Sequence, residues 1–245
     1  AAPTVFERAA GAGHPTFVVG IAAYAGSGFS TATLRGARFL AAKGPAERVE
    51  QAWELAETHP GSLVYCYLPE VDKAGHKHGI ASAEWVAALE DVDAALRRPA
   101  PAGVGVLVTA DHGMIDVPAR RQLVLDESGG WHDGVQHIAG EPRMLHVYLE
   151  PDADPAVVGR RWRSDLEGAA DVLTRAEAIS AGLFGAVTEA AAERIGDLLA
   201  VARGNRALYD GAAEDQRGRG MVGQHGALTP EEWLVPLLRF GSFAP

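Results

Sequence analysis

The sequence predicts an α/β protein built around a mostly parallel sheet flanked by helices. Two apolar runs, residues 63–68 and 104–108, are typical of strands buried on both faces. Between them, Ser82 can cap a helix whose apolar stripe contains Trp85 and Leu89. A strand, helix, strand order with a right-handed crossover makes the two strands parallel. The polar segments that follow both strands then lie at one carboxyl edge, where open α/β sheets bind their ligands.

The remaining elements are predicted from shorter patterns. Residues 17–21 indicate another buried strand, residues 45–58 indicate a helix with Pro45 in its first turn, and residues 70–79 indicate a polar loop. Strands are expected at 144–149 and 198–202. Helices are expected after Asp154-Pro155 and after a capping box that starts at Thr174. A second capping box at Thr229 predicts a final helix over residues 233–240.

We expect one α/β domain of catalytic type over residues 1–245, with an inserted α+β subdomain over residues 141–202. The composition, 47% hydrophobic and 22% charged, is that of a folded globular chain. The start of the sequence is neither a signal peptide nor an initiator methionine, so the domain is expected to be incomplete at its N-terminus. The visible chain slightly favours a cytoplasmic location.

Charge and apolar content narrow the possible partners. The net charge of −10 argues against a broad nucleic-acid-binding surface. An acidic protein can still bind a phosphate where metal ions supply positive charge. No apolar stretch reaches the length of a membrane span. Cys66 is the one cysteine, so no disulfide can form within the chain, and its apolar neighbours predict a buried, inert thiol.

Three short motifs carry residue types that bind metals. Asp72 and His76 are four residues apart, and on one turn of helix that spacing places a carboxylate and an imidazole on one face. Asp111 and His112 end an otherwise apolar strand, and His225 stands between Gln224 and Gly226. Each motif alone also fits an ordinary polar loop or turn. Together, one aspartate and two histidines would complete a three-ligand zinc site with an open position, beside a second ion.

These motifs, in this order, resemble the nucleotide pyrophosphatase/phosphodiesterase family of the alkaline phosphatase superfamily. The resemblance rests on residues 67–79, on Thr-Ala-Asp-His-Gly-Met at 109–114 and on Gly-Gln-His-Gly at 223–226. It implies an alkaline-phosphatase-like fold and a two-zinc hydrolase that acts on a small phosphorylated, nucleotide-like substrate. By match, Asp72, His76 and His225 hold one zinc, and Asp111 and His112 contribute to the other.

The resemblance also implies a threonine or serine nucleophile and a further aspartate, both near the start of the family's domain. The sequence has no counterpart, because no aspartate precedes Asp72. We therefore expect the nucleophile upstream of residue 1, and an isolated chain that has little activity and either depends on a partner or associates with itself. The alternatives are a phosphomonoesterase or sulfatase of the same superfamily, and a non-catalytic zinc-binding fragment.

Other polar residues are expected to lie outside the metal site. His78 is predicted to be solvated or to support a ligand, and none of His132, His137 and His146 is expected to be a ligand. Arg143 is expected to pair with acidic neighbours, with a phosphate contact as the alternative.

Overall fold

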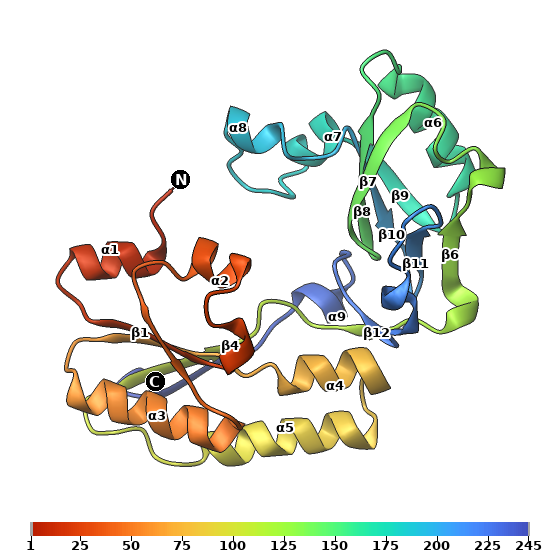
Figure 1. Ribbon diagram of the computed structural model, residues 1–245. Helices are drawn as coiled ribbons and strands as arrows, with labels where there is room; N and C mark the ends of the chain where they lie inside the picture. Colours follow the sequence, from red (N-terminus) through yellow and green to blue (C-terminus); the bar gives the residue numbers. More distant parts are fainter. Residues whose placement is uncertain (1, 245) are drawn as a thin grey trace. The chain divides into compact units, whose positions relative to one another are not determined.

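The computed structural model describes residues 2–244, which form two compact units (Figure 1). The first unit contains the chain up to Ala74, the segment Ala81–Thr109 and the chain from Pro236 onward. The second contains Gly75–Ile80 and Ala110–Val235. The division cuts through one helix, α4, which is continuous from Glu70 to His78.

The first unit contains a parallel sheet in the order β2-β1-β3 and a separate antiparallel pair, β4 with β13. Its strands are β1 (Thr16–Gly20), β2 (Arg38–Ala41), β3 (Leu63–Cys66), β4 (Gly105–Thr109) and β13 (Leu237–Gly241). Its helices are α1 (Val5–Gly11), η1 (Ala22–Tyr24), α2 (Gly28–Thr33), α3 (Pro45–Thr58) and α5 (Ala83–Leu96), together with the first part of α4.

The core of the first unit lies between β1 and α3. All five residues of β1 are buried, and Phe17 and Val19 pack with Ala52 and Leu55 of α3. The predicted helix over residues 45–58 and the Ser82 cap of α5 are both confirmed. Near this core, burial raises the pKa of the Cys66 thiol to about 11, so the thiol stays protonated at neutral pH, as expected for an inert cysteine.

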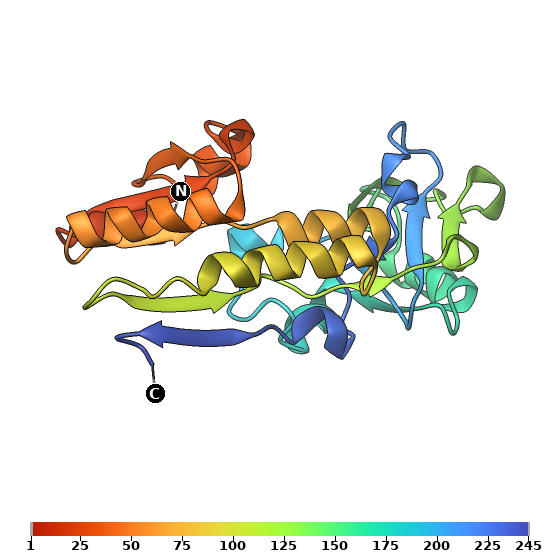
Figure 2. The ribbon, with the colours of Figure 1, turned by 90° about the horizontal axis from the view of Figure 1, so that it is seen from below.

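Two predictions about the central strands are wrong. Strands β3 and β4 are not hydrogen-bonded in one parallel sheet, since β4 pairs with β13 instead, as Figure 2 shows. Neither strand is buried on both faces: Tyr65 of β3 is 42% exposed and Leu107 of β4 is 56% exposed. Apolar runs predict strands, but burial on both faces requires neighbouring elements that the described part of this unit does not provide.

The end of the chain also differs from expectation. The predicted helix over residues 233–240 is instead a short helix, α9 (Pro230–Trp233), followed by β13. Pro236 cannot donate a backbone hydrogen bond and disfavours a helical residue before it, so the helix stops and an extended strand follows. The predicted capping box also fails, because Thr229 makes no side-chain cap hydrogen bond.

The second unit is organised by a four-stranded antiparallel sheet in the order β7-β8-β10-β9. The strands of this sheet are β7 (Val135–Glu141), β8 (Met144–Leu149), β9 (Ala170–Thr174) and β10 (Leu198–Ala202). The helices are α6 (Pro155–Asp165), α7 (Arg175–Ser180), α8 (Glu189–Ala192) and α9, with the short turns η2 (Ala119–Arg121), η3 (Glu127–Gly129) and η4 (Arg217–Gly220). Trp162 of α6 is fully buried against this sheet with Leu198 and Val147.

Two smaller strand pairs complete the second unit. They are β6 (Gln122–Leu125) with β11 (Ala207–Asp210), which are parallel, and β5 (Ile115–Asp116) with β12 (Gly223–Gln224), which are antiparallel. The strands predicted at 144–149 and 198–202 and the Thr174 capping box are confirmed. The four-stranded sheet begins at Val135, before the predicted start of the inserted subdomain at residue 141, whose extent stays a prediction. No helix within residues 2–244 has the length and apolar character needed to cross a membrane.

Candidate metal centre

The first candidate ligands lie on α4, a segment that the sequence predicted as a loop. Glu70 and Asp72 fall in its first turn, and His76, Lys77 and His78 fall in its last. Acidic side chains near a helix N-terminus and basic ones near its C-terminus are stabilised by the helix dipole. This charge order explains why so polar a segment forms a helix, and it places Asp72 and His76 one turn apart on one face.

Three histidines from separate segments of the second unit converge. The ring of His225, which follows β12, stacks on the ring of His112, which follows β4, with centroids 3.5 Å apart and planes at 15°. The ring of His76 lies 5.2 Å from that of His225 and is tilted by 52°. Asp111 adds a carboxylate that is 82% exposed, with one oxygen 3.7 Å from Nε2 of His112.

Two of these rings are held by backbone carbonyl groups. Nδ1 of His76 donates to the carbonyl oxygen of Gly223 at 2.9 Å, and Nδ1 of His112 donates to that of Gly113 at 2.8 Å. Because a carbonyl oxygen only accepts, Nδ1 carries a proton in both rings, which leaves Nε2 as the nitrogen that can bind a metal. Metal-binding histidines usually have their second nitrogen bonded in this way, so both rings are oriented for a metal at Nε2.

Close backbone packing explains two glycines in the motifs. A Cβ atom at Gly113 would overlap the carbonyl oxygen of Glu231, and one at Gly223 would overlap Sδ of Met114 and the carbonyl of Gly75. The backbone of Val222 donates to the carbonyl oxygen of His76 at 2.8 Å. The segment before His225 therefore packs directly against the last turns of α4, which places His225 beside His76.

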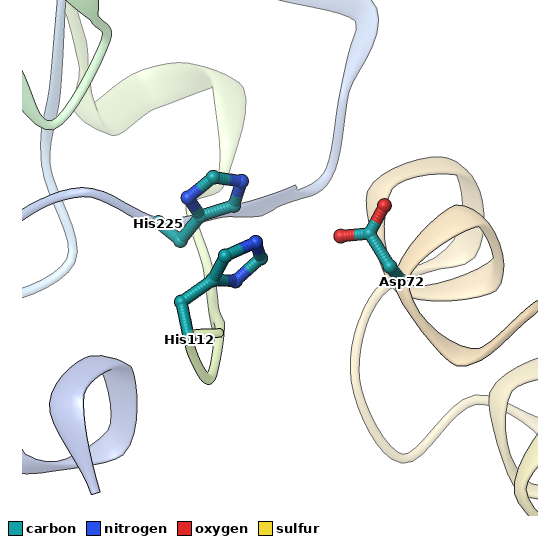
Figure 3. A group of neighbouring side chains, drawn as sticks. All are labelled: Asp72, His112 and His225. Atoms are coloured by element: carbon teal, nitrogen blue, oxygen red, sulfur yellow. The ribbon is translucent and has the colours of Figure 1, made fainter. Parts of the chain in front are cut away.

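Asp72 is positioned by the same helix as His76, because α4 continues without interruption across the division into units. One ligand atom from each of Asp72, His112 and His225 lies within 4.8 Å of the other two (Figure 3). Two imidazoles and one carboxylate are a donor set that catalytic zinc sites use, with a fourth position left open. The residues present therefore fit a zinc ion.

This group differs from the division of ligands that the resemblance implies, since His112 stands in it where His76 was expected. The physical reason is the packing of the rings: His112 stacks face to face on His225, whereas His76 is farther away and tilted. How Asp72, His76, Asp111, His112 and His225 divide between two ions stays a prediction.

Arg143, His132 and His146 each have a polar partner within the second unit. Arg143 pairs with an acidic residue as expected, and the partner is Glu232, which the sequence did not single out. His132 pairs with Asp210 at 2.8 Å, and His146 accepts from the backbone of Gly196 at 3.1 Å. Burial lowers the pKa of His146, which favours its neutral form.

Comparison with known proteins identifies the family of this chain. The matching family model makes the chain a phosphodiesterase-like member of the alkaline phosphatase superfamily. The chain belongs to the type I phosphodiesterase / nucleotide pyrophosphatase family, whose sequence profile matches residues 27–228. No curated protein matches the chain by sequence.

Solved structures share the fold at low sequence identity. Murine ectonucleotide pyrophosphatase / phosphodiesterase 5 is 16% identical with a TM-score of 0.66, and the alignment covers 97% of this chain and 63% of that one. An inactive variant of the murine protein, with threonine replaced by alanine, was solved in complex with AMP. Phosphonoacetate hydrolase from Sinorhizobium meliloti, in complex with phosphonoacetate, is 20% identical with a TM-score of 0.68, with coverages of 97% and 68%. This chain therefore spans about two thirds of the length of these relatives.

Proposed function

We propose that this chain supplies the zinc-binding part of a hydrolase that cleaves phosphodiester or nucleotide pyrophosphate bonds. The observation that carries the proposal is the convergence of His76, His112 and His225, with Nδ1 of two rings held by backbone carbonyl groups. Membership of the family supports the reaction class. Bound zinc would supply positive charge for phosphate oxygens and an open coordination position.

The chain's own residues would hold the ions and set the local charge. His76 and His112 present Nε2, and Asp72 and Asp111 contribute carboxylates that offset the charge of the ions. The resemblance suggests two ions. His76 would help to hold one of them, and Asp111 would help to hold the other. We propose a small phosphorylated, nucleotide-like substrate, in keeping with the AMP bound to the murine relative's inactive variant.

A zinc titration of the purified chain tests this proposal. We expect saturable binding of one or two ions, with release of protons as histidines lose any proton they carry. Isothermal titration calorimetry and elemental analysis give the affinity and the stoichiometry. Absence of zinc binding contradicts the proposal. Zinc binding that persists without turnover, even when the family's nucleophile segment is supplied, would favour the non-catalytic zinc-binding alternative.

We also propose that the first unit associates with a second copy of itself. Within the described residues β4 pairs only with β13, and apolar side chains on this pair are exposed, with Leu237 at 65%. Unpaired strand edges and exposed apolar surface favour association. Sedimentation equilibrium should show a concentration-dependent dimer that Leu237→Lys weakens. A monomer at every concentration would exclude this partner.

A further inference from the structure

A buried ion pair of the second unit lies near the histidine cluster, which consists of His76, His112 and His225. The guanidinium of Arg143 donates through Nε and a terminal nitrogen to both carboxylate oxygens of Glu232, at 3.0 and 2.6 Å. Both side chains are almost fully buried, at 0% and 1% exposure. The remaining terminal nitrogen of Arg143 donates to the carbonyl oxygens of Gly204, at 2.7 Å, and Arg206. The pair is therefore bidentate and closed off from water.

Glu232 also holds the segment that follows His225. Its Oε1 accepts from the backbone N–H of Ala227 at 2.9 Å, and its Oε2 accepts from the hydroxyl of Thr229 at 2.7 Å. Gly226, between His225 and Ala227, has a φ of +116°, and a Cβ atom there would lie 3.1 Å from Cβ of Glu141 and 3.6 Å from Cβ of Arg143. The turn after His225 is thus fixed against the β7–β8 hairpin and against Glu232.

Helix α9, which contains Glu232, also holds the segment that carries His112. The carbonyl oxygen of Glu232 accepts from the N–H of Gly113 at 2.6 Å, and that of Glu231 accepts from the N–H of Met114 at 3.1 Å. Gly113 directly follows His112, and its carbonyl oxygen accepts from Nδ1 of that histidine. Glu232 therefore contacts the chain one residue after His112 through its backbone and two residues after His225 through its side chain.

The negative charge of Glu232 strengthens its hydrogen bonds. Burial raises the pKa of the Glu232 carboxyl, but hydrogen bonds from Arg143, Thr229 and Ala227 outweigh it and hold the pKa below its ordinary value. Glu232 is thus ionised at neutral pH and makes charge-assisted hydrogen bonds, which are shorter and stronger than neutral ones.

From these contacts we infer that Arg143 and Glu232 are positioning residues for the metal centre, since they lock the segments of His112 and His225 at the separation that one ion needs. The inference rests on the proposed zinc function and adds to it, because neither side chain is a ligand. Removing a group that orients metal ligands typically weakens metal binding about 10- to 100-fold.

The test compares Glu232→Gln with a matched control in the same unit. Asp197 also accepts from a backbone N–H, that of Leu149, and pairs with an arginine, Arg175, but it contacts neither histidine segment. We expect Glu232→Gln to weaken zinc binding about 10- to 100-fold, and Asp197→Asn to leave it within about twofold, at temperatures where both are folded by circular dichroism. Equal losses in both variants, or an unchanged affinity in Glu232→Gln, overturn the inference.

Two milder variants guard against a Glu232→Gln protein that does not fold. Arg143→Lys keeps the charge but loses the planar fork, and Thr229→Val removes one donor to Glu232. Both should weaken zinc binding by less than Glu232→Gln does. Full wild-type affinity in both folded variants overturns the inference.

A second measurement requires no metal. In the metal-free wild type, NMR should show a nuclear Overhauser effect between the ring protons of His112 and His225, whose centroids are 3.5 Å apart. This signal should weaken in Arg143→Lys and persist in Asp197→Asn. A wild-type chain that shows it but binds no zinc contradicts the proposed function alone. A signal unchanged in Arg143→Lys and Thr229→Val contradicts the positioning role.

Discussion

A longer chain that supplies the family's nucleophile segment is expected to hydrolyse an aryl phosphodiester about 10⁴- to 10⁶-fold faster than the 245-residue chain. The reason is that hydrolysis needs a nucleophile as well as bound metal ions. The candidate centre contains residues that could bind metal, but the resemblance identifies no threonine or serine nucleophile within the sequence. Catalytic groups of a hydrolase act as a unit, so the loss of the nucleophile removes most of the rate enhancement.

Turnover of bis(p-nitrophenyl) phosphate in the presence of zinc measures this difference. A longer chain in which the nucleophile is changed to alanine serves as control, and it should fall to the level of the 245-residue chain. The relative solved with AMP offers a precedent, since its threonine-to-alanine variant is inactive. Full activity from the shorter chain, lost when one of its own threonines or serines is changed, would show that the nucleophile lies within it.

Replacement of His225 by alanine is expected to weaken zinc binding by more than about 100-fold, which exceeds the effect of losing a group that only orients a ligand. His225 is the residue that both other rings approach, and it belongs to the group with Asp72 and His112. Without it, at most one imidazole of that group remains. Calorimetric titration of the folded variant measures the change.

His137→Ala is the matched control for this replacement. His137 lies on β7 with an exposed side chain and contacts Tyr148, outside the histidine cluster. Its variant should bind zinc with wild-type affinity. If His137→Ala weakens binding as much as His225→Ala, or if neither has an effect, the assignment of His225 as a ligand is wrong.

The elements that the sequence predicted well are those with strong local signals. Pro45 begins α3, Ser82 caps α5, and the Thr174 capping box begins α7. Local signals misled where a distant contact decided the outcome. Pro236 ends the helix before residues 237–241, but their extended form also depends on pairing with β4, which local patterns do not reveal.

The candidate site was predictable to the level of its motifs. The spacing of Asp72 and His76, and the placement of His112 after an apolar strand, indicated candidate metal ligands, and the rings of His76 and His112 lie near that of His225. The residues that hold these segments in place could not be predicted from the sequence. The pattern from Thr229 to Glu232 indicates a capping box, whereas the carboxylate of Glu232 is used for a buried pair with Arg143, 89 residues away.

The location of bound zinc tests the central claim most directly. A crystal of the chain grown with zinc, with diffraction measured on both sides of the zinc absorption edge, gives an anomalous difference map that shows each ion. We predict a peak within about 2.0–2.2 Å of ligand atoms from Asp72, His112 and His225 or, as the resemblance implies, of His76 in place of His112. A map with no peak at these residues, or with zinc bound only elsewhere on the chain, would contradict the account.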